Sequence, residues 1–358
     1  MHMRIGIIGT GFMGSTHAAA WKKAGANIVG FLADPPSEAR QIAQQYGARV
    51  FSSLEELIEN ADVVDICSPT HLHSEMAIAA AGAGRHIVCE KPLARTVEQG
   101  EAMIEACRTA GVRLFVAHVV RYFPEYALAA GRVHTGDIGK VGTAQYRRLS
   151  YRPKKPVGNW FLDEEKSGGI LLDLMIHDFD IARWVAGDVV SVYARKVTSY
   201  RKDSPADYGM VILAHASGAL SHVSGAWAYP PPVFRTGFEI CGDGGIIQHD
   251  SESESPIEAL IRQETSDAPD VGLPASPLAE SPYDLEIADF YRCLNEGGEP
   301  RVSAEDGLAA LKIACAAIES ARTGQAVELE PRGERGEKEP KTGPELDGEH
   351  GTSKGGQR

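Results

Sequence analysis

The stretch Arg4-Ile-Gly-Ile-Ile-Gly-Thr-Gly-Phe-Met-Gly14 decides the fold. Its apolar start, residues 4–8, predicts a buried strand, and residues 14–24 have the pattern of a helix. Three glycines in between form the motif G-x-G-x-x-G. Such glycines permit a tight turn, close approach of the backbone to a diphosphate, and close packing of the helix. We therefore expect the whole turn to bind a dinucleotide, namely Gly9, Thr10, Gly11, Phe12, Met13 and Gly14.

A carboxylate after the next predicted strand indicates which dinucleotide this is. The strand 28–33 ends at Asp34, 20 residues after Gly14. A carboxylate at this spacing binds the hydroxyls of the ribose. It would repel the 2′-phosphate of NADP, and the following residues 35–37 supply no arginine to attract one. The sequence therefore predicts NAD rather than NADP as the cofactor.

The pattern downstream of the motif divides the chain into two domains and a tail. Apolar runs at 63–67, 87–89 and 114–117 alternate with helical segments, which predicts an α/β Rossmann domain with a doubly wound parallel sheet over residues 1–121. Strand candidates then follow one another around a helix at 169–185, and two more helices come later. These strands are expected at 143–149, 189–198, 210–215 and 238–241, and the later helices at 283–295 and 304–322.

This second pattern predicts an α+β domain with a large open, mostly antiparallel sheet over residues 122–330. Residues 250–282 are rich in Ser, Pro and acids and are expected to form a surface loop. Residues 331–358 hold six positive and six negative side chains, seven glycines and a single apolar residue, Leu346. Such a segment buries too little surface to offset its ordering entropy, so we expect a disordered charged tail.

Composition and charge exclude several classes of function. The chain has 358 residues, 36 Lys and Arg against 49 Asp and Glu, and a net charge of −13. This charge argues against nucleic-acid binding and against docking on anionic membranes. No apolar run reaches the ~18 residues of a membrane span. Six cysteines without CxxC pairing predict reduced residues in a cytoplasmic protein, and no zinc spacing is present, so no metal is predicted. The acidity is local, because residues 250–299 hold thirteen acidic side chains against two arginines.

Two further motifs carry groups that could perform chemistry. Lys91 follows the predicted strand 87–89, and strand ends of this kind line the ligand crevice of a parallel sheet. Asp173, His177 and Asp180 stand at i, i+4 and i+7, so one helix would place them on one face. Lys91 could hydrogen-bond a substrate hydroxyl, and His177 could act as a general base that Asp173 orients. From these residues alone, a lysine in a surface turn and a structural Asp–His pair remain open alternatives.

Taken together, the motifs match a known family. The sequence resembles the glucose–fructose oxidoreductase/inositol dehydrogenase (Gfo/Idh/MocA) family from Ile5 to about Glu330 and is most similar to its inositol 2-dehydrogenase branch. The matching segments are GTGFMG (9–14), Asp34, SPTHLH (68–73), CEKPLA (89–94), HVVRYFP (118–124) and GGILLDLMIHDFDIARWVAG (168–187). The resemblance implies a Rossmann domain followed by a domain with a large open sheet, whose outer face often joins subunits into a homodimer or homotetramer.

The resemblance also implies roles for matched residues. His177 would remove the proton of the hydroxyl, Lys91 would hydrogen-bond that oxygen, and Asp173 would tune and orient the pair. Thr70 departs from the family, where many relatives carry Asn, and residues 153–160 do not match the inositol enzymes, which leaves the substrate open. Cofactor contacts are implied for Ser68, Pro69, Thr70, His73, Glu90 and Lys91, and substrate contacts for Arg121, Trp160 and His177.

The function implied is that of an NAD(P)-dependent dehydrogenase acting on CH–OH groups. We expect NAD to accept a hydride from the carbon of a secondary hydroxyl in a cyclitol or sugar, as in an inositol 2-dehydrogenase. Two other functions stay open. The first is a sugar hydrolase or epimerase that retains its NAD and oxidises its substrate transiently. The second is a nucleotide-binding regulator without catalysis.

Overall fold

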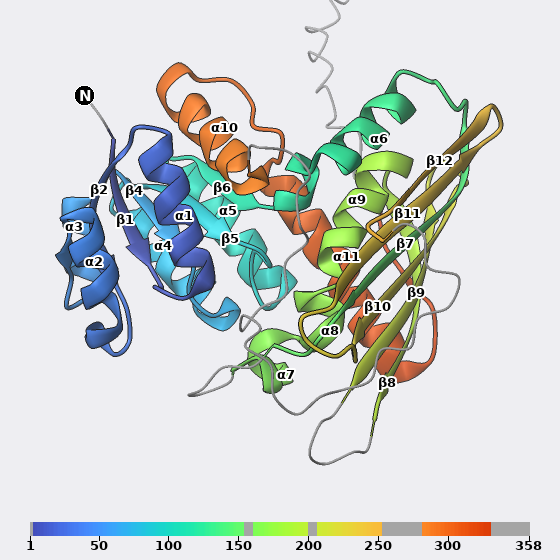
Figure 1. Ribbon diagram of the computed structural model, residues 1–358, viewed down its shortest axis with the longest axis horizontal. Helices are drawn as coiled ribbons and strands as arrows, with labels where there is room; N and C mark the ends of the chain where they lie inside the picture. Colours follow the sequence, from blue (N-terminus) through green and yellow to red (C-terminus); the bar gives the residue numbers. More distant parts are fainter. Residues whose placement is uncertain (1–2, 154–159, 200–205, 253–280, 331–358) are drawn as a thin grey trace, which may run out of the picture.

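The computed structural model describes residues 3–153, 160–199, 206–252 and 281–330 (Figure 1). The first part of the chain builds a sheet of six parallel strands in the order β3-β2-β1-β4-β5-β6. The strands are β1 (Arg4–Ile8), β2 (Asn27–Leu32), β3 (Arg49–Val50), β4 (Val63–Ile66), β5 (His86–Glu90) and β6 (Leu114–Ala117). This order reverses between β1 and β4, and ligands of doubly wound sheets bind at such a switch point. The prediction of a Rossmann domain is confirmed.

The helices of this domain begin and end where the local sequence provides caps. Ser53 caps α3 (Leu54–Asn60), and Thr96 forms a capping box with Gln99 at the start of α5 (Val97–Ala110). Gly47 and Gly111 end α2 and α5 in the left-handed conformation. The helices are α1 (Phe12–Lys23), η1 (Pro36–Ala39), α2 (Arg40–Tyr46), α3 (Leu54–Asn60), η2 (Thr70–Leu72), α4 (His73–Gly82) and α5 (Val97–Ala110).

The second sheet has seven strands in the order β12-β11-β7-β10-β9-β8-β13. Within the described part of this second sheet, only the β10–β7 pair is parallel, so the prediction of a mostly antiparallel sheet is also confirmed. The strands are β7 (Val141–Ser150), β8 (Val189–Thr198), β9 (Asp207–His215), β10 (Leu220–Trp227), β11 (Phe234–Gly242), β12 (Gly245–Asp250) and β13 (Val327–Glu328).

Helices cover one face of this second sheet, on the side that faces the Rossmann domain (Figure 1). The opposite face carries outward side chains, as the strict alternation of buried and exposed residues along most of β9 shows. The helices of this part are η3 (Val119–Tyr122), α6 (Pro124–His134), η4 (Trp160–Leu162), α7 (Glu164–Ser167), α8 (Gly169–Asp173), α9 (Ile176–Ala186), α10 (Pro282–Glu296) and α11 (Ala304–Thr323).

Helix α10 returns to the Rossmann domain, although its position in the sequence places it in the second half of the chain. Ile287, Phe290 and Cys293 are buried in the same apolar cluster as strand β1 and helix α1. The rings of Phe290 and Phe115 lie 5.0 Å apart. Helix α10 therefore packs onto the Rossmann domain, while α11 contacts both α5 of that domain and strand β8 of the second sheet.

The helix predicted at 169–185 is in fact two helices, α8 and α9, which break at Leu174 and Met175. Met175 lies over Gly209 of β9 and Gly225 of β10, where a Cβ atom on either glycine would come within 2.5 Å of its side chain. The break lets Met175 pack closely onto the sheet. No described helix has the length and apolar character that a membrane crossing requires.

Candidate active site

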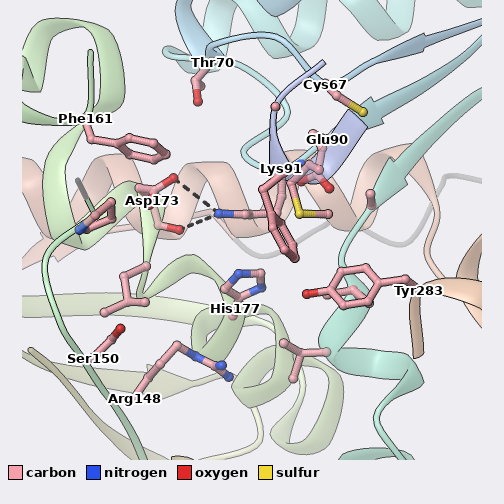
Figure 2. A pocket seen from close by; sticks show the side chains of 18 of the residues that line it. Cys67, Thr70, Glu90, Lys91, Arg148, Ser150, Phe161, Asp173, His177 and Tyr283 are labelled. Carbon is pink, nitrogen blue, oxygen red and sulfur yellow. Dashed lines mark hydrogen bonds and ion pairs between the residues drawn. The ribbon is translucent and has the colours of Figure 1, made fainter. Parts of the chain in front are cut away.

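A pocket lies where the carboxyl ends of the Rossmann strands meet strand β7 and helices α8, α9 and α10 (Figure 2). Among the residues named from the sequence, the structure brings together Gly11, Phe12, Met13, Ser68, Thr70, Glu90, Lys91, Trp160, Asp173 and His177 in its wall. Gly9, Thr10, Gly14, Asp34, Pro69, His73 and Arg121 are not part of this wall.

The glycine turn fits a dinucleotide in this structure. Gly9 has φ +89°, and a Cβ atom there would lie 2.5 Å from the carbonyl oxygen of Cys67. A Cβ atom on Gly14 would lie 1.9 Å from the carbonyl oxygen of Gly9. Gly11 caps α1 without a side-chain hydrogen bond, and the first turn of α1 holds no acidic residue. The first N–H groups of α1 are thus open to a diphosphate, which the helix dipole also favours.

Asp34 and His73 lie outside the pocket for different reasons. Asp34 follows β2 and is exposed, beside the turn whose Gly9 N–H donates to Leu32 O at 2.8 Å. This position suits the far, adenosine end of a dinucleotide. His73 is buried, with Nδ1 2.9 Å from Pro92 O and Nε2 2.9 Å from Ser68 O. Its ring therefore ties two strand-end loops together at their main chains, whereas the sequence suggested contact with the cofactor.

Lys91 and Asp173 form the polar centre of the pocket. Lys91 Nζ donates to Asp173 O at 2.9 Å and to Asp173 Oδ1 at 3.3 Å. The two side chains are 17% and 10% exposed, so this ion pair is shielded but still open to the pocket. Asp173 thus binds Lys91. Among the described residues, no hydrogen bond joins Asp173 to the His177 ring, so the predicted orienting role has no such contact behind it.

His177 lies at the start of α9 and faces the same space (Figure 2). Its Nδ1 atom is buried and finds no hydrogen-bond partner among the described residues. Burial lowers the pKa of His177 well below its usual value, and the positive charges of Lys91 and Arg148 lower it further. The ring is therefore neutral at physiological pH, which is the form that a general base requires.

The prediction that Arg121 contacts substrate is wrong. Arg121 is buried, with Nη2 2.6 Å from Asp180 Oδ1 and Nη1 3.2 Å from Asp306 Oδ2, and it stacks over the ring of Trp184. A guanidinium held this completely cannot also reach a ligand. Asp180, predicted to share a face with Asp173 and His177, is the partner of Arg121 instead.

The pocket residues that were not identified from the sequence include Arg148, Ser150 and Tyr283 (Figure 2). Arg148 on β7 is buried and makes a bidentate pair with Asp178, at 2.8 Å and 3.0 Å. Arg148 lies on the predicted strand 143–149 and Ser150 comes directly after it, so their i, i+2 spacing could have placed both on one face. Tyr283 lies in the first turn of α10, more than a hundred residues after His177, and nothing in its local sequence distinguishes it.

A glycine turn at the switch point of a doubly wound sheet, beside a lysine and a neutral histidine, defines an NAD-binding oxidoreductase. Residues 3–118 match the oxidoreductase family with an NAD-binding Rossmann fold, GFO/IDH/MocA, and residues 130–329 match the C-terminal alpha/beta domain of this family. The chain therefore belongs to the Gfo/Idh/MocA family, and NAD is its cofactor, as the sequence predicts.

Similar proteins agree with this assignment. The chain is 31% identical to the myo-inositol 2-dehydrogenase of Thermotoga maritima, over 92% of this chain and 99% of that protein. It is 30% identical to the levoglucosan dehydrogenase of Pseudarthrobacter phenanthrenivorans, over 89% and 96%. A solved structure of levoglucosan dehydrogenase with NADH and levoglucosan superposes with a TM-score of 0.76 at 28% identity, covering 92% of this chain and 99% of that one.

Proposed function

We propose that this protein oxidises a secondary hydroxyl of a neutral sugar or cyclitol with NAD as the acceptor. The observation that carries the proposal is that the Lys91 ammonium and the neutral His177 ring face one pocket beside the glycine turn. Enzymes named for inositol and levoglucosan among the relatives support this substrate class.

The residues of the chain divide the work of the reaction between them. NAD, when bound along Gly9–Gly14 and Asp34, supplies the acceptor for the hydride. His177 accepts the hydroxyl proton at a ring nitrogen. Lys91 donates a hydrogen bond to the same oxygen and stabilises the negative charge that develops there. Asp173 holds Lys91 Nζ in place through two contacts.

The lining of the pocket favours an uncharged substrate with an apolar face. The charge of Arg148 is already balanced by Asp178, so the pair can donate to a hydroxyl but has little excess charge for a carboxylate. Trp160 and Phe161 stack with centroids 4.0 Å apart, and Trp227 and Phe234 also line the space. Aromatic walls of this kind cover the C–H face of a sugar ring.

A substrate screen tests this function. Inositols, anhydrosugars, aldoses and sugar acids are incubated with NAD and, separately, NADP, while reduced cofactor and oxidised product are both quantified. We expect turnover with NAD on neutral polyols and one reduced cofactor per product. Product without accumulation of reduced cofactor would indicate the NAD-retaining hydrolase or epimerase instead. Absence of turnover on every compound would indicate the non-catalytic nucleotide-binding regulator. No observation here favours either of these two.

We also propose that the protein forms a homodimer or homotetramer through the outer face of its second sheet. Met210 and Ile212 of β9 are 57% and 46% exposed, and Tyr208 is exposed on the same strand. Leu220 extends this apolar surface onto the neighbouring strand β10. An apolar sheet face without covering helices is a typical site of subunit contact. Light scattering measures the resulting mass.

A further inference from the structure

A buried histidine beneath the pocket takes no part in the chemistry proposed above. His17 lies on α1 and is fully buried. Its Nδ1 atom is 3.0 Å from Asp65 Oδ2, and its Nε2 atom is 3.1 Å from Glu90 Oε1. The Nε2 contact is an ion pair without hydrogen-bond alignment. A ring between two carboxylates satisfies both only when both nitrogens carry protons, which makes it an imidazolium.

The electrostatic surroundings of His17 agree with a cation. Burial alone would lower the pKa of His17, but the Asp65 carboxylate and the Cys67 sulfur beside Nδ1 raise it well above the usual value. Tyr283 and Glu286 of α10 face the same cluster. Burial raises the pKa of Glu286 well above its usual value, so its carboxyl stays protonated and does not compete for the charge.

The partner of His17 connects the cluster to the pocket. Glu90 is the last residue of β5 and is 6% exposed. Its Oε2 atom accepts from the backbone N–H of Lys91 at 3.0 Å, while its Oε1 atom faces His17. One carboxylate thus links a buried cation to the main chain of the residue whose ammonium borders the substrate space.

We propose that His17 is a positioning residue: its buried imidazolium, paired with Asp65, holds the Glu90 carboxylate, which in turn fixes the backbone of Lys91 beside the pocket. The inference rests on the proposed role of Lys91. A lysine with four rotatable bonds reaches a defined oxygen only when its backbone is fixed, and small displacements of a reacting group cost up to ~10²-fold in rate.

Kinetics of His17→Gln, Glu90→Gln and the double variant test the link. We expect His17→Gln to lower kcat at least about 10-fold while the KM for NAD changes less than about 2-fold. In the double variant the two losses do not multiply, because His17 acts through Glu90. Losses that multiply would overturn the link. Trp21→Phe is the matched control, since it removes another donor to Asp65, 2.7 Å away, without touching Glu90. It should keep kcat within about 2-fold even if the melting temperature falls.

A measurement without turnover keeps this test separate from the proposed function. In ¹⁵N-histidine spectra of the NAD-bound enzyme at pH 8, the resonance that His17→Gln removes should show both ring nitrogens protonated. A neutral ring would overturn the proposal. So would a metal ion held in stoichiometric amount by the wild type and lost from the variant, since His17 would then be a ligand rather than a cation. If Lys91→Met stays active while His17 is an imidazolium, the catalytic role proposed for Lys91 is wrong, whereas the ion pair between His17 and Glu90 is supported.

Discussion

Replacing Lys91 with Met tests the polar centre of the pocket most fully. The substitution keeps most of the length of the side chain and removes the ammonium that lies 2.9 Å from Asp173 O. Loss of one preorganised donor to a developing oxyanion costs about 10²–10³-fold in kcat, or ~2.7–4 kcal/mol. Lys91 is 17% exposed and so is not fully desolvated, which favours a loss of kcat near the lower end of this range. In the variant the Asp173 carboxylate is left without its Lys91 partner beside the pocket. Its charge opposes negative charge on the substrate oxygen, which favours a loss of kcat near the upper end of the range.

The assay is steady-state reduction of NAD, with NAD affinity measured separately by fluorescence. We expect kcat to fall about 10²–10³-fold and the NAD affinity to change far less. The double variant Lys91→Met with Asp173→Asn separates the two effects, because it removes the unpaired charge and should recover part of the loss. A kcat within about 10-fold of wild type would refute the reasoning, since loss of a preorganised donor to the developing oxyanion should lower kcat by about 10²-fold or more.

Four further predictions follow from the same structure. Asp34→Ala should weaken NAD binding in calorimetry, and an unchanged affinity would contradict the assignment of the ribose site. The acid limb of kcat/KM should lie below pH 6.5, because burial and the cations beside His177 hold its pKa well below that usual value; a limb at or above pH 6.5 would be inconsistent with this. Glu286→Gln should become more stabilising as pH rises above about 4.5, the usual pKa of Glu. The folded wild type keeps a proton that the unfolded chain releases, so the gain in free energy of unfolding grows by up to ~1.4 kcal/mol per pH unit, and a pH-independent difference would argue against a protonated Glu286. Ile212→Glu should reduce the mass seen by light scattering, and an unchanged mass would exclude the outer face of the sheet as the interface.

The fold could be predicted from the sequence because its signals are local. The glycine motif, the apolar strand runs and the alternation of β9 each report directly on the backbone or on burial. The strands β3, β10, β12 and β13 were missed, since two of them are only two residues long and β10 and β12 mix small and polar residues. The predicted loop at 250–282 and the tail at 331–358 lie mostly or wholly outside the described residues.

The site was predicted only in part, because its residues meet through tertiary contacts. Lys91, Asp173 and His177 stand out in motifs, and the structure brings all three to one pocket. Arg121 occurs in an equally distinctive motif, but pairing with Asp180 and Asp306 uses its hydrogen-bonding capacity away from the pocket. Tyr283 reaches the pocket only because α10 packs back onto the Rossmann domain. The spacing of residues along the chain does not predict that α10 packs against the Rossmann domain.

The central claim is that a carbinol carbon of a polyol gives its hydride to NAD in this pocket. A polyol found active in the screen, deuterated at the oxidised carbon, allows a direct measurement by mass spectrometry of the cofactor. We predict one deuterium in each reduced cofactor formed by the wild type, and almost no reduced cofactor from His177→Ala. Reduced cofactor without deuterium, or full activity in His177→Ala, would contradict the account.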